Sequence, residues 1–279
     1  MTSGRKTETG AKAGPAGGRV IVACEMIEDE VRLAYRRVFS SSDGPPIVWV
    51  ESGLHDYPDA LRRRLQELID RLDESAELGR AVRVSSVRTN PENGALVREE
   101  LEVGPAAEVV LAFGYCGAGL KDLVAQNLWL VFPRVDDCIS LFLNCGCSRE
   151  EIRRDPRAYY LTRGWLQRPE QSRDSYSDWV ARYGEERARR LRQMMYAQYE
   201  RVTLIDTGAY DFQACLPESR AFAAEIELEH DTVGGSLQLL ERLFRSVTSA
   251  PEAGSENAAG EIVRLCPGEP VSFLHLVAS

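Results

Sequence analysis

Short apolar runs alternate with amphipathic segments along the first half of the chain. The runs are of the length and composition typical of buried parallel strands, and the amphipathic segments carry apolar side chains at helical spacing. The pattern predicts four strands, each followed by a helix: strand 20–24, helix 26–39, strand 47–50, a helix opening at Pro58, strand 109–113, helix 120–126, strand 128–132 and helix 139–143.

One stretch interrupts this order. Residues 78–105 alternate weakly between apolar and polar positions around a turn at residues 90–94. This pattern predicts an inserted, exposed hairpin or loop.

The second half resumes a strand and helix order after a connector. Residues 144–201 lack a clear strand and carry an aromatic segment at 159–165, followed by a long charged helix at about 183–199. The elements predicted beyond them are strand 202–205, helix 217–224, strand 226–229, a helix opened by Gly234 and Gly235, strand 262–265 and strand 271–277.

These elements predict the α/β class. Right-handed crossovers favour a mainly parallel sheet with helices on both faces, and two Rossmann-like lobes joined by a helical connector. The expected divisions are a disordered tail at 1–18, a first lobe at 19–143, the connector at 144–201 and a second lobe at 202–279.

Composition narrows the possible partners. The chain has 279 residues and a net charge of -9, which argues against a nucleic-acid or anionic-membrane partner. No apolar run approaches the roughly 20 residues of a membrane-spanning helix, and residues 1–18 lack the apolar centre of a signal peptide. We therefore expect a cytoplasmic protein, whose seven cysteines stay reduced.

Four residues, all of types that can bind soft metal ions, follow the ends of predicted strands. They are Cys24, His55, Cys116 and Cys138. Because the carboxyl ends of parallel strands share one edge of a sheet, these side chains are expected to converge. Three thiolates and an imidazole suit a tetrahedral Zn²⁺ site, with His55 as fourth ligand or as a catalytic proton carrier. The alternative is that the cysteines are small core residues.

The remaining cysteines are less informative. Cys145 and Cys147 are candidates for an extra ligand or a redox thiol, and with them the site could instead hold an Fe–S cluster. Cys215 and Cys266 are expected in the core or turns of the second lobe.

Two carboxylates precede Cys138. Asp136 and Asp137 could orient a metal-bound histidine, bind a cation or accept a proton, and Asp137 is the candidate catalytic carboxylate. The alternative is an N-cap for the helix that begins near Ile139.

Glycines and aromatic residues form a candidate cofactor site. Gly117 and Gly119 would let backbone N–H groups approach a ligand, although a structural turn is the simpler explanation for them. Tyr160 and Trp165 belong to an aromatic, cationic segment that could cover a pocket and bind an organic cation or a cofactor ring. Packing of the segment across both lobes is the alternative.

Several of these motifs together resemble one family. Ala23-Cys24, Leu54-His55, Gly114-Tyr115-Cys116-Gly117, Pro133-Arg134-x-Asp136-Asp137-Cys138-Ile139 and Tyr159-Tyr160-Leu161-Thr162-x-Gly164-Trp165 are similar to the prokaryotic domain-of-unknown-function family 1638. The resemblance covers about residues 19–277. The chain departs from the family pattern at Asp136, where a histidine is usual, and at Arg157-Ala158, where Gly-Thr is usual.

The resemblance also suggests a chemistry. Members occur in anaerobic bacteria and methanogenic archaea, where genes for corrinoid methyl transfer are common. This context implies a small-molecule substrate, a corrinoid protein as partner and methyl transfer as the reaction, although the chain lacks a corrinoid-binding Asp-x-His-x-x-Gly pattern. The leading hypothesis is a zinc-dependent methyltransferase. The alternatives are a binding module for a small ligand or a corrinoid cofactor, without catalysis, and an Fe–S protein.

Overall fold

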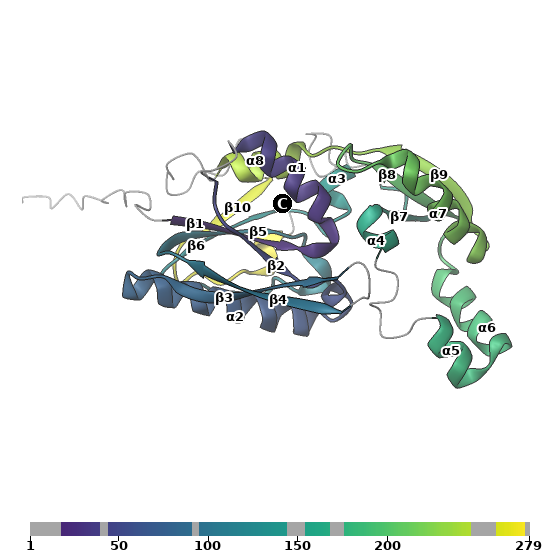
Figure 1. Cartoon of the computed structure of the whole chain (residues 1–279), viewed down its shortest axis with the longest axis horizontal. Helices are drawn as coiled ribbons and strands as arrows, with labels where there is room; N and C mark the ends of the chain where they lie inside the picture. The colour runs from purple at the N-terminus through teal and green to yellow at the C-terminus, as the bar shows by residue number, and fades with distance from the viewer. Residues whose placement is uncertain are drawn as a thin grey trace, which may run out of the picture.

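A mainly parallel five-stranded sheet forms the centre of the protein (Figure 1). The computed structural model describes residues 18–39, 44–90, 95–143, 154–167, 176–246 and 261–276. The strand order is β10-β6-β5-β1-β2, with β1 at Gly18–Cys24, β2 at Ile47–Val50, β5 at Ala106–Ala112, β6 at Trp129–Pro133 and β10 at Ile262–Leu265. The first four in sequence are parallel, and β10 pairs antiparallel with β6 at the edge. The predicted α/β class is confirmed.

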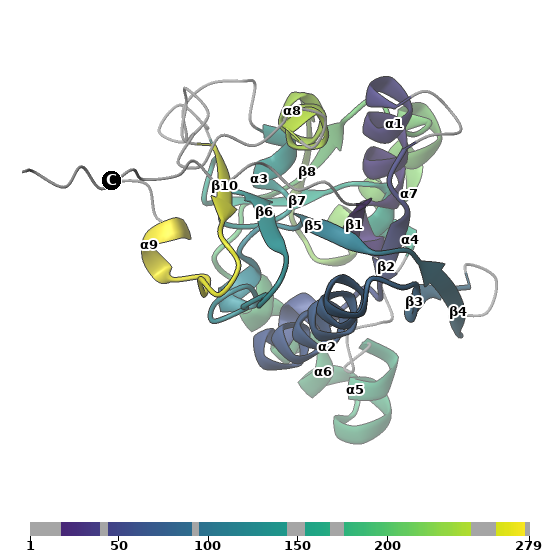
Figure 2. The ribbon, with the colours of Figure 1, turned by 90° about the vertical axis from the view of Figure 1, so that its left-hand side faces the viewer.

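Helices cover both faces of this sheet (Figure 2). α1 (Glu28–Val38) and α8 (Gln238–Ser246) lie on one face, and α2 (Pro58–Leu78) lies on the other. A 3-10 turn, η1 (Glu25–Ile27), joins β1 to α1. Pro58 opens α2 as predicted, because the first turn of a helix needs no N–H donor there. A stripe of leucines at helical spacing on α2, Leu61, Leu65, Leu68 and Leu72, is buried against the sheet.

Residues 78–105, expected as an inserted hairpin, contain two antiparallel strands. β3 (Val82–Thr89) and β4 (Leu96–Val103) pair along their whole length. β3 buries Val82 and Val84, while β4 is mostly exposed. One strand of the hairpin therefore packs on the body and the other faces outward.

A second, three-stranded parallel sheet follows in the chain. It has the order β7-β8-β9, with β7 at Ala158–Leu161, β8 at Arg201–Asp206 and β9 at Glu229–Gly234. The helices of this part are α4 (Arg163–Gln167), α5 (Tyr176–Tyr183), α6 (Glu185–Tyr196) and α7 (Phe212–Glu225), and α5 and α6 project away from the central sheet in Figure 1.

Strand β7 corrects the prediction that residues 144–201 lack a strand. The aromatic segment, expected outside regular structure, divides between β7 and α4. A four-residue strand gives little periodicity, and its backbone partners on β8 lie about forty residues away. The charged helix predicted at about 183–199 corresponds to α6, and a separate helix, α5, precedes it; Gly184, with a φ of 79°, lies between the two.

The predicted helix 120–126 is wrong. Asp122 has a positive φ of 65°, which ends the helical path. The backbone N–H groups that follow find partners elsewhere: Val124 donates to the side chain of Gln66, and Gln126 donates to the carboxylate of Asp73. Tertiary hydrogen bonds to α2 thus replace helical ones.

Three further boundaries differ from prediction. α7 begins well before Pro217, because the Asp211 side chain accepts a hydrogen bond from the Ala214 N–H and caps the helix. β9 begins at Glu229, and residues 226–228 belong to the turn before it. The expected strand at 271–277 contains the short helix α9 (Phe273–Leu276) instead.

The segment expected as a second lobe, 202–279, divides between the two sheets. β8 and β9 belong to the second sheet, whereas β10 completes the central sheet and α8 packs on its face. The central core thus includes Leu240 and Val263, far along the chain.

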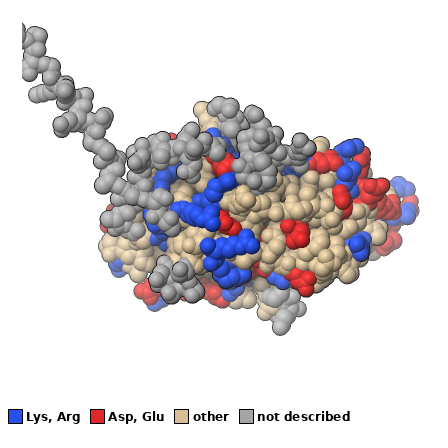
Figure 3. Space-filling model, turned by 90° about the horizontal axis from the view of Figure 1, so that it is seen from above, with Lys and Arg blue, Asp and Glu red and all other residues tan. Residues whose placement is uncertain are grey.

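Charge is unevenly distributed over the surface. Seen from above, Lys and Arg gather near the middle of the face, and Asp and Glu gather mainly toward the end that carries the second sheet (Figure 3). Some of the charges are paired: Arg37 of α1 and Arg245 of α8 both contact Glu241. Within the ranges that the structure describes, no helix has the length and apolar character to cross a membrane.

Candidate functional site

The candidate site lies where the central sheet changes direction. β1 and β5 are neighbours, but the chain leaves β1 toward β2 on one side and leaves β5 toward β6 on the other. In open α/β sheets a crevice forms at the carboxyl ends of such a strand pair, and ligands bind there. Cys24 is the last residue of β1, and Phe113 follows β5. Both line a cavity of about 320 Å³.

Two loops at this edge are joined by backbone hydrogen bonds. The Tyr115 N–H donates to the Val135 carbonyl at 2.8 Å, and the Cys116 N–H donates to the Asp136 carbonyl at 2.9 Å. These bonds place the loop after β5 directly against the loop after β6. The two loops are therefore fixed side by side.

Gly114 permits this close approach. A Cβ atom at Gly114 would lie 2.2 Å from the carbonyl carbon of Asp137, so only glycine fits. With the loops in contact, the Sγ atoms of Cys116 and Cys138 are 3.7 Å apart. The convergence of these two thiols, predicted from the strand ends, is thus present.

The turn that carries Cys116 is strained. Cys116, Gly117 and Ala118 have successive φ angles of 45°, 62° and 83°, in the left-handed region. For Cys116 and Ala118 this conformation costs about 1–2 kcal/mol per residue. Strain of this kind concentrates at functional sites, where the surrounding structure holds it in place.

Three buried thiols line the cavity at the sheet edge. Cys24, Cys116 and Cys138 expose 8%, 8% and 6% of their surface, and all three line the cavity. A hydrogen bond with Cys138 and burial, in that order, hold the pKa of the Cys116 thiol well above its ordinary value. The charges of Cys138, Cys24 and Asp137 raise this pKa further. Ionisation of the Cys116 thiol at neutral pH therefore needs a nearby cation.

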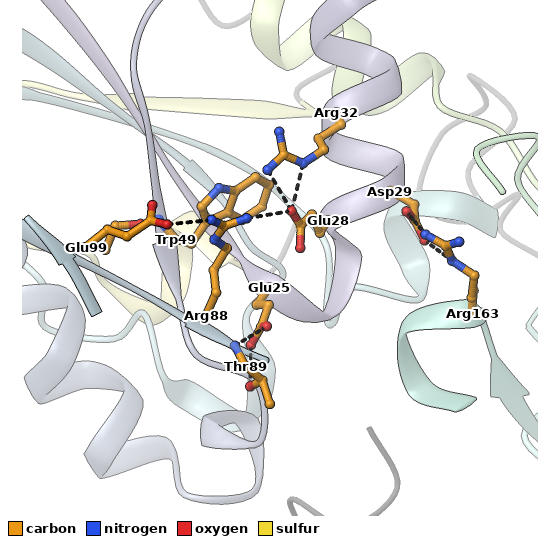
Figure 4. A network of polar contacts seen from close by, with 10 residues as sticks. Glu25, Glu28, Asp29, Arg32, Trp49, Arg88, Thr89, Glu99 and Arg163 are labelled. Atoms are coloured by element: carbon orange, nitrogen blue, oxygen red, sulfur yellow. Dashed lines mark hydrogen bonds and ion pairs between the residues drawn. The ribbon is translucent and has the colours of Figure 1, made fainter. Parts of the chain in front are cut away.

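A buried carboxylate fixes the segment after Cys24. Glu25 is fully buried and accepts hydrogen bonds from the backbone N–H and the hydroxyl of Thr89 (Figure 4). It also accepts hydrogen bonds from the backbone N–H and the hydroxyl of Ser52. It thereby joins the end of β1 to the loop after β2 and to the end of β3. The thiol of Cys24 is positioned by the residue next to it.

The second sheet and α4 supply part of the cavity wall. Arg163 of α4 forms a two-point ion pair with Asp29 of α1 (Figure 4). Gly164 lies so close to the Met26 carbonyl that a Cβ there would be 1.9 Å from the oxygen. This packing places Trp165 at the cavity, together with Tyr159 and Tyr160 of β7.

His55 lies on the cavity wall in a 3-10 turn, η2 (Leu54–Asp56). Its Nε2 atom is 3.5 Å from Oδ1 of Asp56, and its ring centroid is 6.4 Å from that of Trp165. The turn follows Gly53, whose φ is 84°. His55 thus faces the same cavity as the three thiols, within reach of a bound ligand.

Asp137 makes the helix-capping contacts that the sequence suggested as the alternative to a catalytic role. Its Oδ1 accepts from the N–H and the hydroxyl of Ser140, each at 2.9 Å, at the start of α3 (Ser140–Leu143). Its Oδ2 pairs with Arg154. Asp137 also lines the cavity, whereas Asp136 is exposed and contributes its carbonyl to Cys116.

The candidate cofactor residues are brought together in part. Gly117, Tyr160 and Trp165 line the cavity, but Gly119 is not among its described lining residues. A Cβ at Gly119 would lie 2.5 Å from Cδ2 of Leu61, so this glycine lets the loop pack on α2.

Several lining residues were not predicted from the sequence. Glu51 lines the cavity and directly follows β2. Its position after a strand could have identified it from the sequence, because His55 was chosen as a candidate for the same reason. Asp56, Arg154 and Tyr199 also line the cavity, and no motif marks them.

Two of the other cysteines, Cys215 and Cys266, are not among the lining residues of this cavity. Cys215 is buried in the core of the second sheet, as expected, and Cys266 is exposed just after β10. Cys145 and Cys147 lie outside the described residues. Among the described side chains, no group of three or more His, Cys, Asp or Glu is arranged to hold a metal ion as the structure stands.

A family model covers the loops that build this site. Residues 95–244, more than half of the chain, match the family described as "Protein of unknown function (DUF1638)". The chain belongs to this family. The DUF1638 match begins just before β4, ends in α8 and includes Cys116, Cys138 and the aromatic segment, whereas Cys24 and His55 precede it. No curated protein and no solved structure matches the chain.

Proposed function

We propose that this DUF1638 protein holds a zinc ion between Cys24, Cys116 and Cys138 and uses it in methyl transfer involving a thiol. The observation that carries the proposal is the 3.7 Å separation of the Cys116 and Cys138 sulfur atoms. Tetrahedral zinc with Zn–S bonds of about 2.3 Å separates its sulfur ligands by about 3.8 Å. The spacing of Cys116 and Cys138 is thus compatible with two ligands of one ion.

The electrostatics support the same reading. The contacts that raise the pKa of Cys116 are those with neighbouring thiols and a carboxylate, so a divalent cation at this point would reverse their effect. A bound zinc ion would supply the charge that keeps a substrate thiol deprotonated at neutral pH.

The residues of the chain then have separate tasks. The three cysteines hold the ion, and the strained turn and the paired loops keep Cys116 in position. His55, on the wall, is placed to complete the ligand set or to carry a proton. The cavity of about 320 Å³ leaves room for a small substrate beside the thiols.

Metal analysis of anaerobically purified protein tests the zinc site. We expect about one zinc ion per chain in the wild type, and its loss in Cys116→Ser and in Cys138→Ala. Cys215→Ser is the matched control, because Cys215 is an equally buried thiol in the other core and should leave the zinc content unchanged. Circular dichroism identifies variants that fail to fold. Wild-type protein without metal, or with metal that survives both site variants, would refute the site.

A transfer assay tests the reaction. Zinc-loaded protein is incubated anaerobically with a methylated corrinoid and a small thiol, and the thioether product is measured. We expect product with the wild type and none with Cys116→Ser. Stoichiometric zinc without product would contradict methyl transfer, and would favour a second function as a non-catalytic binding module, which the aromatic wall of the cavity supports.

A further inference from the structure

Aromatic residues form part of the cavity wall. Tyr159, Tyr160 and Trp165 come from β7 and α4, Tyr199 comes from the turn before β8, and His55 comes from η2. The face of an aromatic ring carries partial negative charge and attracts a cation within about 6 Å. Several rings around one small cavity form the kind of site that binds quaternary ammonium ions.

This wall is held in place by contacts behind it. The ring of Tyr159 packs edge-on against Tyr196 and Tyr199, with centroids 5.3 Å apart in each pair. The hydroxyl of Tyr160 accepts a hydrogen bond from the Asp155 N–H at 3.1 Å. The rings are therefore oriented before a ligand arrives, which reduces the entropy lost on binding.

One protein cation already uses this wall. The guanidinium carbon of Arg154 lies 5.8 Å from the centroid of the Tyr160 ring. Arg154 is also ion-paired with Asp137, so it neutralises that carboxylate and does not leave a positive charge for an anionic ligand.

Among the described ion pairs, Asp56 is the lining carboxylate without an arginine partner. Glu51 pairs with Arg64, whose Nε atom lies 3.5 Å from its Oε2 atom. Among the ion pairs of the described residues, Asp56 takes part in one, with the imidazole of His55 at 3.5 Å. The side chain of Asp56 is half exposed. A zinc ion held by three thiolates would add a further net negative charge. The field in the cavity thus favours a cation over an anion.

We propose that the ligand of this cavity is a small organic cation of the methylated ammonium class, held between the aromatic wall, Asp56 and the thiols. This inference rests on the proposed function, because it names the substrate class for the same cavity. It requires no metal for binding, since rings and a carboxylate provide the contacts.

Choline and its uncharged isostere 3,3-dimethyl-1-butanol are the probes. They have the same shape and differ in charge, so calorimetric titration isolates the contribution of the cation. We expect choline to bind about tenfold more tightly. Equal affinity of the two compounds, or no choline binding, would overturn the inference.

Variants then locate the binding. Asp56→Asn and Trp165→Leu should each weaken choline binding by about fivefold or more, and Trp165→Phe, which keeps a ring, should restore most of it. Asp59→Asn is the matched control: Asp59 is an exposed carboxylate on the same segment that does not line this cavity, and its variant should bind normally. Choline binding that is unchanged in both site variants lies elsewhere and also overturns the inference.

Metal content separates this inference from the zinc proposal. All titrations are repeated after removal of metal with a chelator. Zinc-loaded protein that fails to prefer choline refutes the cation site and leaves the zinc site standing. Protein that is purified without metal and still prefers choline supports the cation site although the zinc proposal has failed.

Discussion

Replacing Glu30 with glutamine is expected to make the protein more stable at alkaline pH than the wild type. Glu30 lies on α1 with 1% of its surface exposed, and the hydroxyl of Thr207, just after β8, donates to its Oε1 at 3.0 Å. Burial is the largest cause that raises the pKa of Glu30, to about 7, and the charge of Asp29 adds to it. The hydrogen bonds of the Glu30 carboxylate and the charge of Arg163 lower this pKa in part.

The direction of the pH effect follows from proton uptake. In the unfolded chain Glu30 has an ordinary pKa of 4.5, so between about pH 4.5 and 7 the folded protein binds more protons than the unfolded one. The free energy of unfolding therefore falls as pH rises through this window and levels off above it. The full shift corresponds to about 3 kcal/mol, of which about 2 kcal/mol falls between pH 5.5 and 8. Glutamine does not titrate and removes this loss.

Urea unfolding at pH 5.5 and pH 8, followed by tryptophan fluorescence, measures the effect. The stability of Glu30→Gln relative to the wild type should rise by about 2 kcal/mol between the two pH values. Glu67→Gln removes an exposed carboxylate of α2 and controls for the change in net charge, so its difference from the wild type should stay constant. If the stability difference between Glu30→Gln and the wild type is the same at both pH values, the reasoning is refuted.

Two substitutions test the packing that builds the site. Gly164→Ala would place a Cβ 1.9 Å from the Met26 carbonyl oxygen. This overpacking should lower the free energy of unfolding, measured with urea, by about 1–3 kcal/mol. An unchanged urea midpoint would show that α4 does not pack closely against this carbonyl. Leu65→Ala empties a fully buried position of α2 and should cost about 2–5 kcal/mol, whereas Leu78→Ala, half exposed on the same helix, should change stability by no more than about 0.5 kcal/mol. Similar losses for the two leucines would contradict the burial of the helix stripe.

The predictions succeeded where the signal was local. β2 and β10 have the predicted bounds, and α2 begins at the predicted proline. Apolar runs and helical spacing are properties of neighbouring residues, so they are visible without knowledge of the fold. The convergence of Cys116 with Cys138 was also predictable, because the parallel arrangement of the strands implies it.

The predictions failed where distant residues decide the conformation. Residues 120–126 have a helical pattern, but the side chains of Gln66 and Asp73 take their N–H groups out of the helix. β7 is too short to show periodicity and exists because β8 pairs with it. In both cases the decisive hydrogen-bond partner lies more than forty residues away.

By itself the sequence determined the α/β class, the strands of the central sheet and the edge at which the thiols collect, because these follow from residue spacing and from the geometry of parallel strands. Only the tertiary structure decided which residues face the thiols. The wall of Tyr159, Trp165 and Tyr199 reaches the cavity through the contact of Gly164 with Met26 and the ion pair of Arg163 with Asp29. Such contacts depend on the fit of two surfaces from distant parts of the chain, and no local pattern records that fit.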